Sequence, residues 1–245
     1  MTREELLKIA KPVLFNTEMV QAILEGRKTV TRRCVKYKYS NTEMKMHTDK
    51  YGTRLIEIQK NVEGETHGRY PDGRTWQKLL PYIEKNPPFK KGDYLYVRET
   101  WQYLYELDGN EQIIEGTDRY YYKATDTIPY DTYVDSMGIT HETVPWKPSI
   151  HMPKEAARLF LKVTDVRVER LQDMEEEDAI KEGIHPKMCP NCSGLDCDLC
   201  SESEYTVMDE FMYLWNSTIK KAGLDKYGWD ANPWVWVIEF ERVDV

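Results

Sequence analysis

A helix-to-strand junction is encoded by Gly26-Arg27-Lys28-Thr29-Val30-Thr31-Arg32-Arg33. Upstream of it, Asn16 or Thr17 can cap a helix. The apolar residues of that helix recur at helical spacing and are Met19, Val20, Ile23 and Leu24. Gly26 is suited to the left-handed residue that ends a helix, and residues 29 to 35 favour an extended chain. The sequence therefore predicts a helix that stops at a basic turn and leads into a strand.

The charge of this turn contrasts with that of the whole chain, whose formal net charge is -8. The turn carries four cations, and no Asp or Glu occurs between Glu25 and Glu43. A local positive field indicates a site for a negative or polar ligand. Lys28 is the candidate base or anion hook and Thr31 the candidate hydroxyl, while the candidate phosphate-binding forks are Arg27, Arg32 and Arg33. The alternative is a solvated basic turn that is stabilised by the helix dipole.

The rest of the chain indicates a sheet with flanking helices, a fold of the α+β class. Alternating residues predict strands at 94–101, 158–167 and 234–240. Helical periodicity predicts helices at 173–182, where Gly183 follows, and at 207–219. The 17 Tyr, 7 Trp and 5 Phe also favour short strands. We expect a single domain over 1–245, in which residues 41–91 and 102–148, rich in Gly, Pro, Asp and Tyr, are insertions.

The chain begins without the apolar region of a signal peptide, and its longest strongly apolar run covers only residues 234–238. These features predict a cytoplasmic protein that does not enter a membrane. The acidic net charge also disfavours sequence-independent binding of duplex DNA, which depends on many phosphate contacts. Any nucleic-acid site is therefore expected to be local.

A cysteine cluster occupies the segment 185–205. Its four thiols form two CxxC knuckles separated by four residues and belong to Cys189, Cys192, Cys197 and Cys200. This pattern predicts a zinc-binding loop in which four thiolates saturate the ion, so the zinc is structural. An iron-sulfur cluster and a redox-active pair are the alternatives. A zinc deaminase is disfavoured, because His141-Glu142 lacks the spacer of an HxE motif.

Four blocks of the chain resemble the ASCH-domain family, in particular its phage and prophage members. The blocks are residues 14–33, 92–101, 163–183 and 234–243, and the predicted insertions are not matched. The resemblance implies a small β-barrel related to the PUA fold, a fold associated with RNA and modified nucleosides. It therefore implies a protein that recognises RNA or a modified nucleotide.

The resemblance also implies a possible activity, because a small bacterial member of the family deacetylates acetylated cytidine. Its working Lys, Thr and Glu match Lys28, Thr31 and Glu182. In that amidohydrolase reading, Lys28 accepts the proton of Thr31, Thr31 attacks the acyl carbon, and Glu182 holds the leaving amine. The position of Glu182 is itself unusual. A carboxylate in the last turn of a helix opposes the dipole, so we expect a cationic partner, for which Lys28 is the candidate.

Further pocket candidates follow the predicted strands. Arg98 lies at a strand end, Trp101 and Trp146 offer faces on which a base can stack, and Ser149 offers a hydroxyl. The alternative for both Trp residues is a place in the core. A third function, a phage-encoded adaptor for a host protein, would use residues 41–91 and 102–148 as its surface. The sequence does not fix an oligomeric state.

Overall fold

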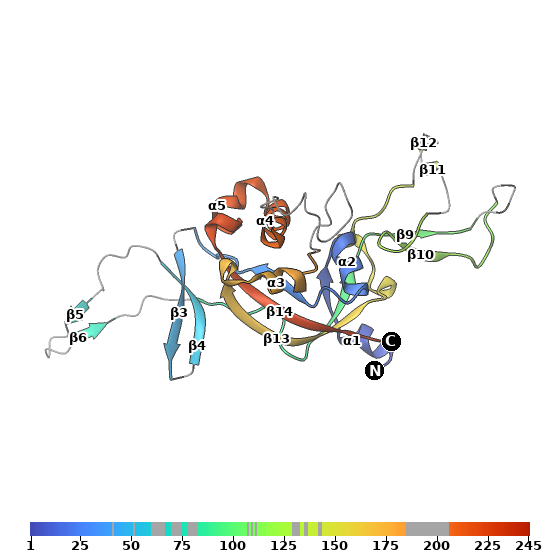
Figure 1. Ribbon diagram of the computed structural model, residues 1–245. Coiled ribbons are helices and arrows are strands. Elements are labelled where there is room, and N and C mark those ends of the chain that lie inside the picture. The colour runs from blue at the N-terminus through green and yellow to red at the C-terminus, as the bar shows by residue number, and fades with distance from the viewer. Residues whose placement is uncertain are drawn as a thin grey trace, which may run out of the picture.

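The computed structural model describes residues 1–40, 42–50, 52–59, 67–69, 75–77, 83–106, 108, 110, 112–128, 133–134, 137–141, 144–184 and 206–245. Helices and strands are both present in this part of the chain and form an α+β fold, as predicted (Figure 1). No helix among the described residues is both long and apolar enough to span a bilayer.

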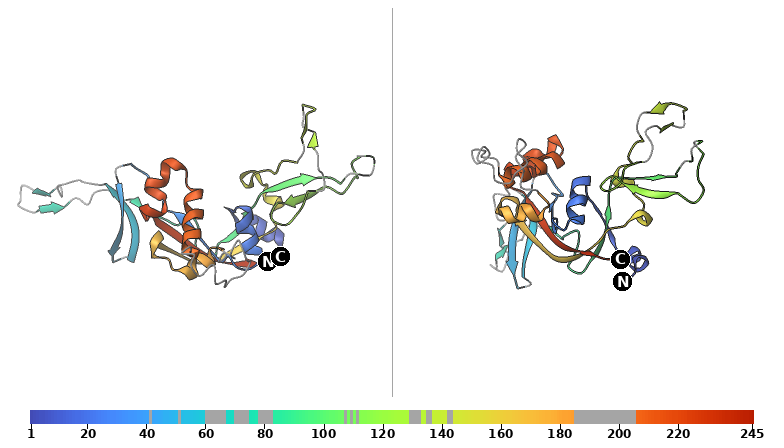
Figure 2. Two further views of the ribbon diagram at one scale, coloured as in Figure 1. Left: turned by 45° about the horizontal axis from the view of Figure 1, so that its top comes forward. Right: turned by 45° about the vertical axis from the view of Figure 1, so that its right-hand side comes forward.

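The body of the molecule is a five-stranded sheet in the order β1-β8-β13-β14-β2. Its strands are β1 (Lys11–Leu14), β8 (Tyr94–Arg98), β13 (Phe160–Arg170), β14 (Trp234–Val243) and β2 (Val30–Cys34). β1 pairs with β8 in parallel, and the other pairs are antiparallel. The long β13–β14 pair forms the curved centre of the sheet, and the two chain termini lie near its end (Figures 1 and 2).

This sheet is open among the described residues, so the closed barrel expected from the sequence is not found there. β1 and β2 are its two edges and do not pair with each other. A side chain joins them instead, because Arg33 Nη2 donates to the Leu14 carbonyl at 3.2 Å. β1 is only four residues long and contains Pro12, which has no backbone N–H to offer to a ladder.

The two faces of β14 are covered by separate apolar clusters, as alternation along a strand requires. Trp236, Ile238 and Phe240 pack with the helix α2 (Thr17–Leu24) through Val20 and Ile23. On the other face, the apolar cluster combines residues of β2 and β14 with the helices α3 (Glu176–Lys181) and α4 (Val207–Thr218); its members include Val30, Val235, Val237, Ala179, Phe211 and Trp215. The other α-helices of the described residues are α1 (Arg3–Ile9) and α5 (Leu224–Tyr227).

Small sheets extend from the body in Figures 1 and 2. One contains β3 (Thr42–Asp49), β4 (Gly52–Gln59) and β7 (Ile83–Glu84), and the others are the pairs β5 (His67–Arg69) with β6 (Thr75–Gln77), β9 (Trp101–Leu104) with β10 (Arg119–Tyr122), and β11 (Tyr133–Val134) with β12 (Thr140–His141). The single strand expected at 94–101 is therefore wrong in one respect. The chain leaves β8 at Glu99, whose buried carboxylate binds Arg158 at 2.8 Å, before β9 begins in another sheet.

The cysteine cluster Cys189, Cys192, Cys197 and Cys200 lies outside the described residues. The zinc-binding loop at 185–205 thus stays a prediction.

Candidate functional site

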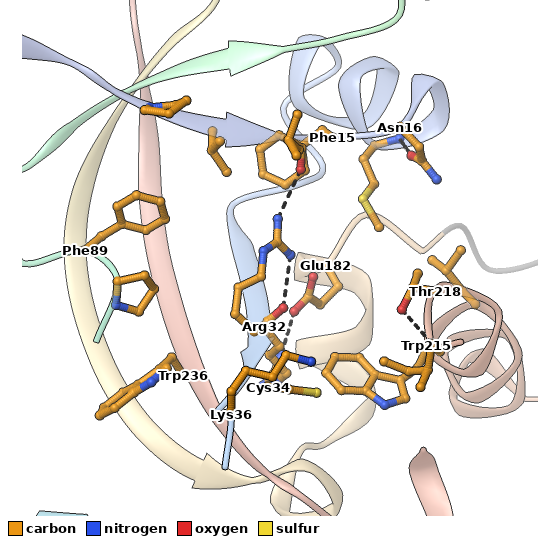
Figure 3. A pocket seen from close by; sticks show the side chains of 18 of the residues that line it. Phe15, Asn16, Arg32, Cys34, Lys36, Phe89, Glu182, Trp215, Thr218 and Trp236 are labelled. Atoms are coloured by element: carbon orange, nitrogen blue, oxygen red, sulfur yellow. Dashed lines mark hydrogen bonds and ion pairs between the residues drawn. The ribbon is translucent and has the colours of Figure 1, made fainter. Parts of the chain in front are cut away.

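A cleft of about 960 Å³ lies between the edge strands β1 and β2. Residues 12–16 and Met19 line one side, and residues 32–36 of β2 and its continuation line another. The walls are completed by residues 85, 86, 88 and 89, by the helix α4, and by Pro148 and Ser149, where a short 3-10 helix begins. Figure 3 shows Phe89 and Trp236 on one side of the cleft, Trp215 and Thr218 on the other, and Glu182 between them. The walls thus include several aromatic side chains among other apolar residues, and a carboxylate lies among them.

The basic turn lies next to this cleft because three elements hold its backbone. Gly26 ends α2 with a φ of +78°, as predicted. The Lys28 N–H then donates to Ala22 O at 3.0 Å, and the Thr29 N–H donates to Lys181 O of α3 at 2.9 Å. On the other side, Phe240 of β14 donates to Thr29 O. Lys28 therefore precedes the first residue of β2, and neither Lys28 nor Thr31 is among the residues that line the cleft.

Lys28 is buried and 2% exposed. Its ammonium donates to Glu182 Oε2 at 2.7 Å, to Glu182 O at 2.6 Å and to Val30 O at 2.8 Å. These acceptors match the three protons of a charged lysine. The predicted pairing of Lys28 with Glu182 is therefore confirmed.

Glu182 reaches Lys28 because α3 packs closely on α2. Glu182 is the C-cap of α3, and the next residue, Gly183, has a φ of +94°. A Cβ on Gly183 would lie 2.8 Å from the Ala22 Cβ and 3.1 Å from the Lys28 Cβ. Only glycine permits both this backbone conformation and this approach. Gly183 thus fixes the distance between the two charges.

Arg32 extends the ion pair into a network. Its Nη1 lies 3.4 Å from Glu182 Oε1, and its Nη2 lies 3.1 Å from Asp178 Oδ2 on the preceding turn of α3. The Nη1 contact holds the Glu182 oxygen that Lys28 does not bind, and the Asp178 contact holds the guanidinium in place. Arg32 Nε is buried without a hydrogen-bond partner among the described residues, so this guanidinium is held at a cost in free energy.

Thr31 and Arg33 lie on the other face of β2. Arg33 Nη1 donates to Thr31 Oγ1 at 2.6 Å, and its guanidinium lies 5.5 Å from the centre of the Phe15 ring. Thr31 is 1% exposed. The Thr31 hydroxyl oxygen accepts from a cation in this arrangement, which stabilises negative charge on that oxygen.

The electrostatics of Lys28 combine opposing effects. Burial, the largest effect, lowers the pKa of Lys28 below its ordinary value, and Arg33 and Arg32 lower it further. The charge and hydrogen bond of Glu182 act in the opposite direction. The site therefore brings the lysine closer to deprotonation than an exposed lysine, while Glu182 supports its charged form.

The structure does not bring all predicted pocket residues to the cleft. Ser149 and Arg33 line it, whereas Arg27 binds Glu25 and Gly183 O outside it. Arg98 is used to bind the carbonyls of Ile150 and Met152. Trp101 is buried in an apolar cluster with Tyr96 and Phe160, and the half-buried Trp146 does not line the cleft.

Sequence reasoning missed several residues of the site. Phe89, Trp215 and Trp236 line the cleft. In the sequence, Trp215 and Trp236 belong to patterns typical of core residues, and Phe89 lies in the predicted insertion 41–91. Asp178 had a usable signal, because it precedes Glu182 by four residues and therefore shares its helix face.

Among the described residues, no group of three or more His, Cys, Asp or Glu side chains could hold a metal ion. No family model, curated protein or solved structure matches the chain.

Proposed function

We propose that the cleft binds a nucleotide unit, either within RNA or as a free modified nucleotide, in the manner of an ASCH-type, PUA-like protein. The observation that carries the proposal is the combination of aromatic walls with fixed polar groups in a cleft of about 960 Å³. This volume falls in the range of small-molecule sites, which are mostly apolar with a few placed polar groups.

The chemistry of the lining supports this proposal. A nucleobase needs an apolar face for stacking and polar atoms at its edge. Phe89 lies opposite Trp215 and Thr218 of α4 in Figure 3 and, like Pro88, offers apolar surface. Ser149, Asn16 and Glu182 offer polar atoms. Of these aromatic walls, Phe89 is half-buried and therefore retains accessible surface.

Replacing Phe89 tests the proposal. We expect Phe89→Ala to weaken binding of a pool of short single-stranded RNA, since stacking on an aromatic side chain contributes about 1–3 kcal/mol per base. The measurement is fluorescence anisotropy with labelled RNA. Tyr213→Ala is the matched control, because Tyr213 is 72% exposed on α4 and does not line the cleft. Equal affinities of both variants and the unmodified protein would contradict the proposal, as would a lack of RNA binding by all three.

A second candidate function, hydrolysis of an N-acylated cytidine-type nucleoside, is favoured by the bond from Arg33 to Thr31 Oγ1. In this reaction Lys28 first passes a proton to the Glu182 carboxylate, and its neutral amine then takes the Thr31 hydroxyl proton while Oγ1 bonds to the acyl carbon. The C–N bond then breaks, and the proton passes from Lys28 to the leaving amine. Water hydrolyses the acyl-threonine in a second step, which releases the acid. Arg33 stabilises the charge on Oγ1, and Glu182 orients Lys28.

Turnover of N4-acetylcytidine, followed by chromatography of released cytidine, tests this candidate. We expect Thr31→Val and Lys28→Ala each to lower kcat/KM by about 100-fold or more, since a positioned proton acceptor contributes about 10²–10⁴-fold. Thr29→Val is the control, because Thr29 is exposed and two residues away. Turnover that persists in Thr31→Val excludes the threonine nucleophile.

A further inference from the structure

The three arginines of the basic turn differ in what they already bind. Arg27 pairs with Glu25 at 2.5 Å and also donates to Gly183 O. Arg32 pairs with Asp178 and Glu182 inside the protein. Arg33 forms no ion pair with a carboxylate among the described residues, although it is the arginine that lies opposite Phe15. Its charge is therefore not neutralised by a direct partner in that part of the chain.

The hydrogen bonds of Arg33 leave a defined set of donors. Nη1 donates to Thr31 Oγ1 at 2.6 Å and to Arg32 O at 3.0 Å, which uses both of its protons. Nη2 donates one proton to Leu14 O at 3.2 Å. A guanidinium has five N–H groups, so Nε–H and the second Nη2–H remain. Two neighbouring N–H groups of a fixed guanidinium match two oxygens of a phosphate.

The position of this guanidinium makes it accessible to a ligand. Arg33 lines the cleft and is only partly buried. Its side chain is held at three points, so binding an anion costs little further side-chain entropy. Lys36 lines the same cleft, and its ammonium lies 4.1 Å from the centre of the Tyr227 ring without a carboxylate partner among the described residues. Arg33 and Lys36 are thus two cations of the cleft without a carboxylate partner among the described residues, in a chain of net charge -8.

Burial, the largest effect, lowers the pKa of Arg33, and the charge of Glu182, which also lines the cleft, raises it, but the two side chains form no ion pair. Glu182 Oε2 accepts from Lys28 and Glu182 Oε1 lies 3.4 Å from Arg32, so both oxygens already face cations. The carboxylate is thus held by two positive charges, and Arg33 remains as the third.

We propose that Arg33 is the phosphate subsite of the cleft, which makes the ligand a phosphorylated nucleotide unit rather than a free nucleoside. This phosphate subsite rests on the proposed nucleotide-binding function, and it adds that the phosphate group of the ligand is recognised by Arg33. The Nε–H and Nη2–H fork binds two phosphate oxygens, and Lys36 adds longer-range attraction. The same chemistry fits a terminal phosphomonoester and the phosphodiester of an RNA strand.

The experiment compares the four ribonucleosides, their 5′-monophosphates and the matching dinucleoside monophosphates by isothermal titration calorimetry. We expect the phosphate-containing compounds to bind about 10- to 100-fold more tightly than the nucleosides, as charge-assisted hydrogen bonds imply. Arg33→Ala removes this difference, and Arg33→Lys, which keeps the charge but loses the fork, removes most of it. Arg27→Ala, a neighbouring arginine outside the cleft, keeps it. Preference for the dinucleoside monophosphates identifies the phosphodiester as the source, and preference for the 5′-monophosphates identifies the phosphomonoester.

Two outcomes overturn the subsite in distinguishable ways. Equal affinity for nucleosides and phosphorylated compounds removes the phosphate subsite but leaves nucleotide-unit recognition in place. Binding of none of the compounds removes both. Thermal unfolding of each variant checks whether it is folded. If Arg33→Ala does not fold, Arg33→Lys provides the comparison with the unmodified protein.

Discussion

The buried ammonium of Lys28 is the residue on which the site depends most directly. Removing an ammonium from water is costly, and the cost is offset only where its protons are bound and its charge is balanced. Lys28 meets both conditions through Val30 O and the carbonyl and carboxylate of Glu182. Such a pair contributes little net stability by itself, but breaking it leaves an uncompensated charge inside the protein.

Removing one partner of this pair is therefore more damaging than removing both. We expect Lys28→Met to lower the free energy of unfolding by about 3 kcal/mol, and Lys28→Met with Glu182→Gln to recover at least half of the loss. Urea unfolding followed by tryptophan fluorescence measures both. Arg27→Ala, which breaks a pair with the exposed Glu25, provides the control and is expected to cost less than about 1 kcal/mol. A double variant that is less stable than the single one would show that the pair does not act as a unit.

At the scale of single elements, the sequence predicted what local chemistry determines. α2 begins after Asn16, whose side chain accepts from the Met19 N–H, and ends before Gly26. β14 and α4 also lie within a few residues of their predicted bounds, because their apolar periodicity is long and regular. The break between β8 and β9 was not predictable in this way. It depends on the bond of Glu99 to Arg158, which is 59 residues away.

The same distinction applies to the candidate site: a contact that local chemistry determines was predictable, and contacts that the fold creates were not. The contact of Lys28 with Glu182 followed from a local argument, since a carboxylate at a helix C-terminus needs a cation. The aromatic walls did not, because Phe89, Trp215 and Trp236 come from three separate elements and only the fold places them together. The sequence also did not show which arginine lacks a carboxylate partner among the described residues. Arg32 and Arg33 are adjacent in sequence, but they lie on opposite faces of β2 and so meet different partners.

At the scale of the whole molecule, the small sheet β3-β4-β7 is joined to the body through a buried carboxylate. Glu57 of β4 accepts from the Lys38 N–H at 2.9 Å and the Tyr39 N–H at 3.0 Å, just beyond β2. It also binds Lys85, which donates to Lys36 O at 2.9 Å. Because Lys36 and Lys85 line the cleft, this joint also holds one of its walls.

The joint makes stability depend on pH in a defined direction. Burial, the largest single effect, raises the pKa of Glu57, but the hydrogen bonds from Lys85, Thr42 and the two backbone amides together lower it from 4.5 to about 2. An acid whose pKa is lower in the folded state contributes stability above its unfolded pKa and loses it as pH falls through the folded pKa. The contribution of Glu57 is therefore complete above about pH 4.5 and disappears towards pH 2.

Replacing Glu57 with Gln tests this joint. At neutral pH we expect Glu57→Gln to lower the free energy of unfolding by about 1–3 kcal/mol, because buried donors lose a charged acceptor. The difference from the unmodified protein narrows as pH falls from 4.5 towards 2, since protonation of Glu57 then removes the same charge. Urea unfolding at a series of pH values measures the difference. Glu43→Gln is the control, because Glu43 pairs with the exposed Lys45 of the same strand, β3. A gap for Glu57→Gln that stays constant over this pH range would show that the carboxylate charge does not hold the two sheets together.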